Sequence, residues 1–172
     1  MIDFGKKLRE AKVAKPLHPV EIYEGLDRTT EAGPLREVQK LILSEWYEHY
    51  QDKKDLIIKL HTGEGKTLIG LLILQSILNQ KKGPSIYICP TKNLAAQVMK
   101  EAKKFGIPFC TITDSYLPVE YENGDKILIT YVHKVFNGRT IFGRIEQSFA
   151  FGCCILDDSH ACIESIQANF TH

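Results

Sequence analysis

Residues 57–67 read Ile-Ile-Lys-Leu-His-Thr-Gly-Glu-Gly-Lys-Thr, an apolar segment that leads into a glycine-rich turn closed by Lys66 and Thr67. Gly63 and Gly65 can adopt the positive φ angles of a tight loop, and they leave its backbone amides uncovered. A helical pattern follows, and the N-terminal end of a helix presents N–H groups and a positive dipole to the same place. This order predicts a phosphate-binding loop, with Lys66 on the β- and γ-phosphates and Thr67 on Mg²⁺.

The alternative is a plain glycine turn between a strand and a helix, with a solvated lysine. The flanking elements favour the phosphate loop, because they are the ones that the motif requires. One position departs from the general pattern G-x-x-x-x-G-K-[ST], since Leu60 stands where the first glycine is expected.

A second motif follows about ninety residues later. Residues 153–160 read Cys-Cys-Ile-Leu-Asp-Asp-Ser-His, a short apolar strand that ends in two carboxylates. Parallel sheets bind ligands at the carboxyl ends of their strands, so Asp157 is expected beside the loop that carries Lys66. Asp157 suits the binding of Mg²⁺ through water, and Asp158 suits the positioning or deprotonation of an attacking water. The alternative is an acidic N-cap of the next helix; the phosphate loop favours the catalytic interpretation.

Composition limits the remaining possibilities. The chain has 172 residues, which suits one α/β domain, and its net charge of +1 provides no overall basic field for nucleic acid. No apolar run approaches the roughly 20 residues of a membrane helix, and the N-terminus does not resemble a secretory signal. The five cysteines show no C-x-x-C spacing, and His160 with Cys162 makes a poor metal site. We therefore expect reduced cysteines and a cytoplasmic location.

Strand and helix patterns alternate along the chain after a less regular start, which predicts an α/β fold with a parallel sheet covered on both faces. Residues 1–33 are expected to form a loosely organised N-terminal extension with one short helix, and residues 34–172 the main domain. Strands are predicted over 56–60, 85–89, 107–112, 126–130 and 153–156. Helices are predicted from Pro34 onward and over 66–80, 93–105 and 132–136, with a loop at Asn137-Gly138.

Taken together, the segments resemble the first RecA-like ATPase domain of superfamily 2 helicases of the DEAD/DEAH-like type. The resemblance covers roughly residues 34–165. It rests on four blocks in the expected order: Leu-Arg-Glu-Val-Gln at 35–39, Thr-Gly-Glu-Gly-Lys-Thr at 62–67, Pro-Thr-Lys-Asn-Leu-Ala-Ala-Gln at 90–97 and Asp-Asp-Ser-His at 157–160. A weaker fifth match is Ile-Thr-Tyr at 129–131.

The resemblance implies a P-loop NTPase fold in three α/β/α layers, with ATP and Mg²⁺ as cofactors and a single strand of DNA or RNA as partner. The family commonly replaces the first loop glycine, which accounts for Leu60. Nucleotide binding is implied for Arg36, Gln39, Thr62, Gly63, Glu64, Gly65, Lys66 and Thr67, with Gln39 reading the adenine edge. Metal binding is implied for Thr67 and Asp157, and catalysis for Lys66, Asp157, Asp158 and His160. Contacts with the nucleic-acid backbone are implied for Pro90, Thr91, Lys92, Asn93, Thr130 and Tyr131.

Both nucleic-acid blocks have simpler alternatives. Thr91 and Asn93 are good caps for the helix that follows them, and residues 129–131 also fit a strand end that passes into a helix.

Two departures from the family limit what it implies. Asp158 replaces the family's glutamate, and a carboxylate retracted by about one C–C bond predicts slow hydrolysis unless the backbone compensates. Nothing up to His172 matches the later S-A-T block or a second RecA-like domain. We therefore expect this domain to be part of a larger motor, with a second RecA-like domain as its partner. Alone, this domain is expected to hydrolyse little ATP. The other candidate function is a P-loop ATPase switch that acts on a protein partner without unwinding a strand.

Overall fold

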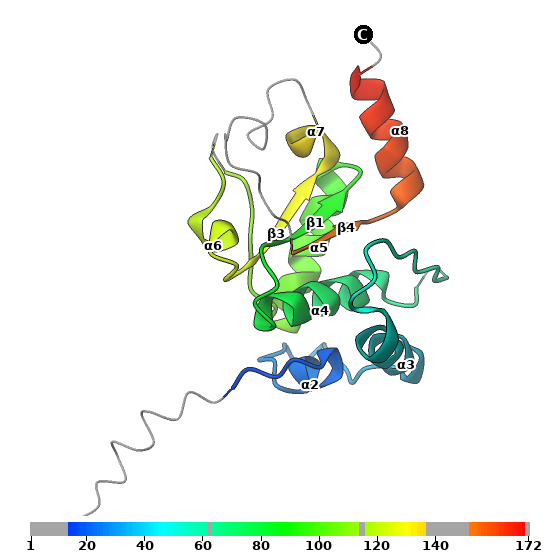
Figure 1. Cartoon of the computed structure of the whole chain (residues 1–172), viewed down its shortest axis with the longest axis vertical. Helices are drawn as coiled ribbons and strands as arrows, with labels where there is room; N and C mark the ends of the chain where they lie inside the picture. Colours follow the sequence, from blue (N-terminus) through cyan, green and yellow to red (C-terminus); the bar gives the residue numbers. More distant parts are fainter. Residues whose placement is uncertain (1–13, 62, 114–115, 137–151, 171–172) are drawn as a thin grey trace, which may run out of the picture.

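Four parallel strands form one sheet in the order β2-β3-β1-β4 (Figure 1). The structure, a computed structural model, describes residues 14–61, 63–113, 116–136 and 152–170. The strands are β1 (Ser85–Cys89), β2 (Phe109–Cys110), β3 (Ile127–Tyr131) and β4 (Cys153–Leu156). Because the strands are parallel, the residues that follow β1, β3 and β4 meet at one edge of the sheet.

Helices cover both faces of this sheet, as the sequence predicts. On one face, α4 (Lys66–Asn79) and α5 (Lys92–Phe105) enclose a core with Tyr87, Cys89, Ile127 and Ile129. On the other face, α6 (Val119–Glu122), α7 (Val132–Val135) and α8 (Ser159–Phe170) enclose a core with Ile86, Ile88 and Leu128. The alternation of strand residues between the two cores follows from the period of two in a β-strand. The predicted α/β fold in three layers is confirmed.

Helix α4 is buried on every side, with residues 68–78 all buried. The sheet lies against one side of it, and α2 (Pro19–Glu24) and α3 (Glu37–Glu45) pack on the other. A helix covered on all sides needs no polar face, which explains its run of leucine and isoleucine.

The described part of the N-terminal extension is well packed, so the expectation of a loose organisation is wrong for residues 14–33. Its one short helix, α2, is confirmed, and Ile22 and Tyr23 belong to the same core as α4. Ser76 Oγ also donates a hydrogen bond to the Leu17 carbonyl at 2.6 Å. Buried side chains of α2 and tertiary hydrogen bonds from α4 hold this segment, and its sequence pattern did not reveal them.

The helix expected from Pro34 begins at Glu37 and continues into a π-helical turn, η1 (Trp46–Tyr50). Strands 85–89 and 153–156 are confirmed, and helices α4 and α5 match their predictions within one residue at either end. Strand β3 is displaced by one residue, α7 ends one residue early, and the strand expected over 107–112 is reduced to Phe109–Cys110. The loop predicted at Asn137-Gly138 lies outside the described residues.

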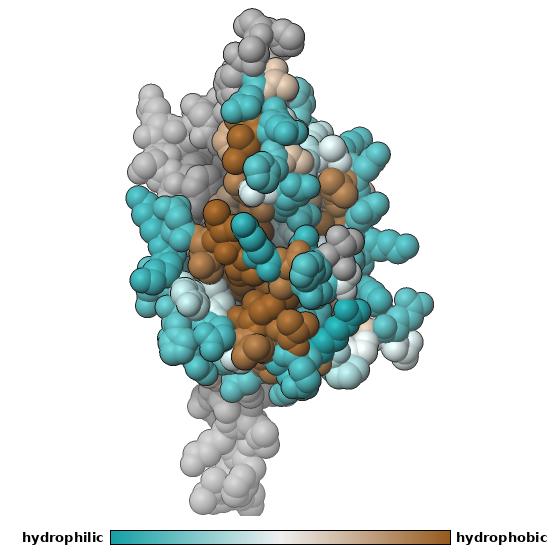
Figure 2. Space-filling model, turned by 90° about the vertical axis from the view of Figure 1, so that its right-hand side faces the viewer, coloured by the Kyte–Doolittle hydropathy of each residue, from teal (hydrophilic) through white to brown (hydrophobic). Residues whose placement is uncertain are grey.

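The strand predicted over residues 56–60 is wrong. The segment has no strand conformation, β4 ends the sheet in the described part of the chain, and the Ile57 side chain is 79% exposed. Leu56 and Ile58 are exposed as well, as is Leu156 on β4. Figure 2 shows apolar side chains gathered on the side of the molecule where α8 and this segment lie in Figure 1. An apolar run predicts burial, but it does not supply the neighbouring strand that burial requires.

No helix in the described part of the chain has the length and apolar composition that a membrane crossing requires.

Candidate functional site

The predicted phosphate loop forms a tight turn directly before α4. Gly63 and Gly65 have φ angles of +88° and +79°, in the region that favours glycine. The Glu64 amide donates to the His61 carbonyl, and the His61 amide donates to the Glu64 carboxylate at 2.6 Å. Thr62, the remaining loop residue of the prediction, lies outside the described residues. The two glycines thus adopt the conformations for which the motif needs them.

Helix α3 fastens this loop from one side. Arg36 Nη1 donates to the Gly63 carbonyl at 2.7 Å, and Gln39 Nε2 donates to the Glu64 carbonyl at 3.0 Å. In a trans peptide the C=O and the following N–H point in opposite directions, so Gln39 turns the Gly65 N–H away from α3. Gln39 Oε1 accepts from the Arg36 amide at 3.0 Å. The predicted contact of Gln39 with an adenine edge stays a prediction, since both ends of its amide are bonded within the protein here.

The N-terminus of α4 offers a site for an anion. Gly65 is its N-cap, and no side chain of the described residues caps the helix there. The first N–H groups of a helix have no intrahelical partner, so an uncapped start presents them together with the positive end of the dipole. The Lys66 side chain is exposed beside them, and a side chain at Gly63 would meet nothing within 4 Å among the described residues. These donors and the open glycine surface fit a polyphosphate.

Asp157 lies close to the loop, as the sequence predicts. Its amide donates to the Ile88 carbonyl at 2.9 Å, which continues the pairing of β4 with β1. Burial raises the pKa of the Asp157 carboxyl, and the neighbouring Asp158 raises it further. The Lys66 ammonium offsets part of this rise. The carboxylate is therefore half-buried and faces the loop lysine.

Tyr87 is the residue of this site that the sequence analysis did not identify. It is 1% exposed on β1 and packs against Gly70 of α4, and burial together with the nearby Asp157 carboxyl raises the pKa of its hydroxyl. A usable signal was present in Ser-Ile-Tyr-Ile-Cys at 85–89, because alternation places Ser85, Tyr87 and Cys89 on the face that carries α4. A tyrosine hydroxyl buried there needs a polar partner.

Asp158 acts as a helix cap in this structure, which is the simpler of the two interpretations of the acidic pair. It has a φ angle of +50°, and its Oδ1 accepts a hydrogen bond from the Ala161 amide at 3.3 Å. Asp158 thus caps α8, since its carboxylate binds the third amide of that helix. His160 is exposed in the first turn of α8. Neither geometry tests the catalytic roles implied for these two residues.

The residues implied in nucleic-acid contacts lie after β1 and at the end of β3, on the same edge as Asp157. Thr91 caps α5, with Oγ1 accepting from the Leu94 amide at 3.3 Å, and it is exposed together with Lys92 and Asn93. Tyr131 is half-buried. Pro90 and Thr130 are buried, so their side chains are not presented at the surface in this structure.

The described residues contain no cluster of three or more histidine, cysteine or acidic side chains able to hold a metal ion. All five cysteines are free. Cys162 is buried, and its thiol lies 3.1 Å from the Asp157 carbonyl, where burial raises its pKa to about 11. The pair His160 and Cys162 is therefore not part of a larger ligand set in the described part of the chain.

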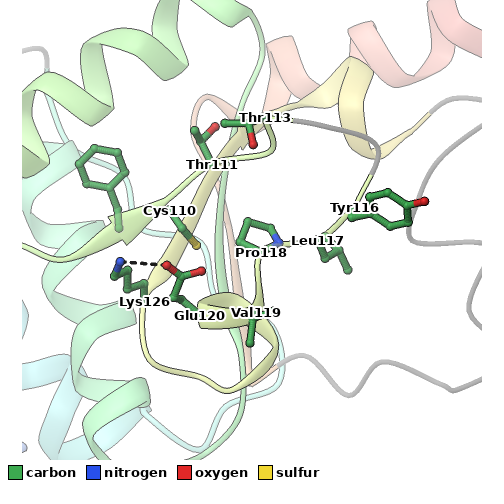
Figure 3. A pocket seen from close by; sticks show the side chains of 10 residues that line it. Cys110, Thr111, Thr113, Tyr116, Leu117, Pro118, Val119, Glu120 and Lys126 are labelled. Atoms are coloured by element: carbon green, nitrogen blue, oxygen red, sulfur yellow. Dashed lines mark hydrogen bonds and ion pairs between the residues drawn. The ribbon is translucent and has the colours of Figure 1, made fainter.

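A separate hollow of about 490 Å³ lies at the opposite edge of the sheet, beside β2 and α6 (Figure 3). The Lys126–Glu120 ion pair, with 3.2 Å between its charged atoms, forms part of its wall. None of the residues implied in nucleotide binding or catalysis lines it. The candidate site is therefore the phosphate loop and not this hollow.

The model of the DEAD/DEAH box helicase family matches residues 36–170, which is most of the chain. The chain belongs to this family. Its fold is accordingly the RecA-like P-loop fold of a helicase ATP-binding domain.

Among curated relatives, the ATP-dependent RNA helicase DBP9 of Kluyveromyces lactis is 39% identical over 70 residues. That alignment covers 36% of this chain and 12% of the relative, so the helicase domain described here matches only a small part of the relative's length. No solved structure gives a significant match.

Proposed function

We propose that this domain binds ATP with Mg²⁺ for an ATP-dependent helicase or translocase that acts on nucleic acid. The observation that carries the proposal is the meeting of Lys66, Thr67 and Asp157 at one edge of the sheet, beside the uncapped start of α4. Lysine, hydroxyl and carboxylate are the three side chains that P-loop NTPases use for phosphates and metal.

Each side chain has a task that its position supports. Lys66 and the first amides of α4 bind and orient the phosphates, while Thr67 and Asp157 hold the metal. Asp158 positions or deprotonates the attacking water, and His160 lies beside it in the same motif. Bound ATP would supply the phosphoryl group that is transferred to water, with Mg²⁺ neutralising its charge.

The nucleic-acid strand is proposed to run across the carboxyl edge of the sheet, over Thr91, Lys92 and Asn93, with Tyr131 near the end of β3. An exposed hydroxyl, a lysine and the start of a helix suit phosphate contacts that position a strand without reading its sequence. The similar relative is named as an RNA helicase, which favours RNA as the strand to test first. We further propose that a second RecA-like domain of the same protein is its partner. The proposed location is a reducing compartment, the cytoplasm or nucleus.

The first test is Mg-ATP binding by calorimetry on this chain, beside Lys66→Ala and the control Lys92→Ala. Binding is expected for the parent chain and for Lys92→Ala, and its loss is expected for Lys66→Ala. Equal affinity in Lys66→Ala would remove the loop from the site.

The second test separates the helicase from a switch that acts on a protein partner. If the proposal holds, single-stranded RNA binds with a log K that falls as log salt rises, and Lys92→Ala reduces that slope by about one unit. Absence of salt-dependent strand binding, together with intact ATP binding, would favour the protein-directed switch.

A further inference from the structure

The phosphate loop is closed on itself by two hydrogen bonds between His61 and Glu64. The His61 amide donates to Oε2 of the Glu64 carboxylate at 2.6 Å. The Glu64 amide donates in return to the His61 carbonyl at 3.3 Å. We call this pair of bonds the 61–64 clasp. It ties two backbone N–H groups of the loop to acceptors that the chain itself provides.

Helix α3 supports the clasp from outside the loop. Arg36 Nη1 donates to the Gly63 carbonyl, and Gln39 Nε2 donates to the Glu64 carbonyl. The Gly63 carbonyl and the Glu64 amide belong to one peptide group, so both ends of that group are bonded within the protein. This peptide must turn before its N–H group can reach a phosphate oxygen.

The Glu64 carboxylate is an anion in a loop that is suited to anions. The amides of a glycine-rich loop bind phosphate oxygens, and a carboxylate accepts from the same N–H groups through strong, charge-assisted bonds. The Glu64 side chain is half-buried, and it forms no ion pair with Lys66 in the described part of the chain. The lysine is therefore left for a phosphate, whereas the carboxylate takes an amide of the loop.

We propose that the Glu64 carboxylate is an autoinhibitory contact, which holds the phosphate loop closed until a polyphosphate displaces it. The inference rests on the proposed function and adds a regulation of the same nucleotide site. The family resemblance implies Glu64 in nucleotide binding, whereas this contact makes its side chain a competitor of the nucleotide. Binding is weakened because only molecules with an open clasp offer the whole loop, and because the carboxylate repels the approaching phosphates.

The test is the affinity for Mg-ATP, measured by calorimetry on this chain and on Glu64→Ala and Glu64→Gln. Alanine removes both the acceptor and the charge, so we expect about tenfold tighter binding, as for the release of a hydrogen bond to a charged group. Glutamine can still accept from the His61 amide but has no charge, so its gain should be smaller. Glu37→Ala and Glu37→Gln are the matched controls, because Glu37 lies on α3 and pairs with Lys40 at 3.0 Å. Both should keep the parent affinity.

A second measurement examines the clasp without nucleotide. The His61 residue is exposed, so only its hydrogen bond protects its amide from exchange with solvent. Hydrogen exchange at this amide, followed by NMR, should be about tenfold slower in the parent chain than in Glu64→Ala. Equal exchange rates would contradict the clasp and overturn the inference.

The two proposals fail in different ways. If neither the parent chain nor Glu64→Ala binds Mg-ATP, the proposed function fails, and the inference fails with it. If both bind with the same affinity, the function stands and the inhibitory role of Glu64 is wrong. Weaker binding in Glu64→Ala would make Glu64 a ligand of the nucleotide, and equal tightening in Glu37→Ala would assign the effect to net charge. Either result would overturn the inference.

Discussion

Asp158 shows how one residue can satisfy a structural and a catalytic pattern at once. Its Oδ1 binds the Ala161 amide, and its backbone lies in the left-handed region at φ +50°. Aspartate and asparagine both cap helices well and tolerate this region, whereas alanine does neither. The cap explains why an aspartate is suitable here, independently of any role in hydrolysis.

The variants Asp158→Asn and Asp158→Ala separate the two roles. Asparagine keeps a capping oxygen, so the free energy of unfolding should stay within about 0.5 kcal/mol of the parent chain. Alanine loses the cap and is strained at positive φ, so it should cost about 2 kcal/mol. Urea unfolding of this chain measures both.

The catalytic half of that prediction is tested by ATP hydrolysis, measured with the second RecA-like domain that we propose as partner. Because asparagine cannot accept a proton from water, Asp158→Asn should lose ATPase activity while it keeps its stability. Retention of activity in Asp158→Asn would leave Asp158 with the cap as its only role.

At the scale of elements, α4 packs against β1 through a contact between Gly70 of the helix and Tyr87 of the strand. Glycine inside a helix costs roughly 1 kcal/mol relative to alanine, so Gly70 in the middle of α4 calls for a reason. The ring of Tyr87 fills the space that a Cβ would need. The pair therefore fixes how closely α4 approaches the sheet at the turn that follows the phosphate loop.

The change Gly70→Ala tests this match. The gain in helix propensity is about 1 kcal/mol, whereas overpacking against a buried ring costs about 1–3 kcal/mol. The net effect should be destabilising, and it should be relieved when Tyr87→Leu removes the ring. A double-mutant cycle by urea unfolding should give a coupling energy of about 1 kcal/mol or more.

Tyr87→Phe serves as the control in that cycle, since it retains the ring and should leave Gly70→Ala as harmful as before. Additive effects of Gly70→Ala and Tyr87→Leu would mean that the two residues do not compete for space.

The packing of α4 on β1 shows what the sequence could and could not predict. The helix α4 and the strands β1 and β4 were predictable, because each is an apolar run of suitable length bounded by residues such as Gly65 and Pro90. The contact of Tyr87 with Gly70 was not, since it depends on a strand side chain meeting a helix from elsewhere in the chain. The loop contacts of Arg36 and Gln39 were missed for the same reason, although the sequence placed both residues in the site.

At the scale of the whole molecule, one side of the domain is apolar and exposed. Strand β4 ends the sheet in the described part of the chain, and residues 56–58 lie outside it with their side chains in solvent (Figure 2). Contiguous apolar surface of this kind favours association with other molecules. We therefore expect this chain to self-associate as its concentration rises.

The same substitution in two isoleucines distinguishes an exposed segment from a core strand. Ile57 is exposed, whereas Ile86 on β1 is fully buried. Ile57→Ala should change the free energy of unfolding by no more than about 0.5 kcal/mol, because it removes little buried surface. Ile86→Ala should cost about 2–5 kcal/mol through lost burial and the cavity left behind. Urea unfolding at low protein concentration compares them, and sedimentation should show less self-association for Ile57→Lys than for the parent chain. If Ile57→Ala were as costly as Ile86→Ala, residues 56–60 would belong to the core in solution, as their apolar sequence first suggested.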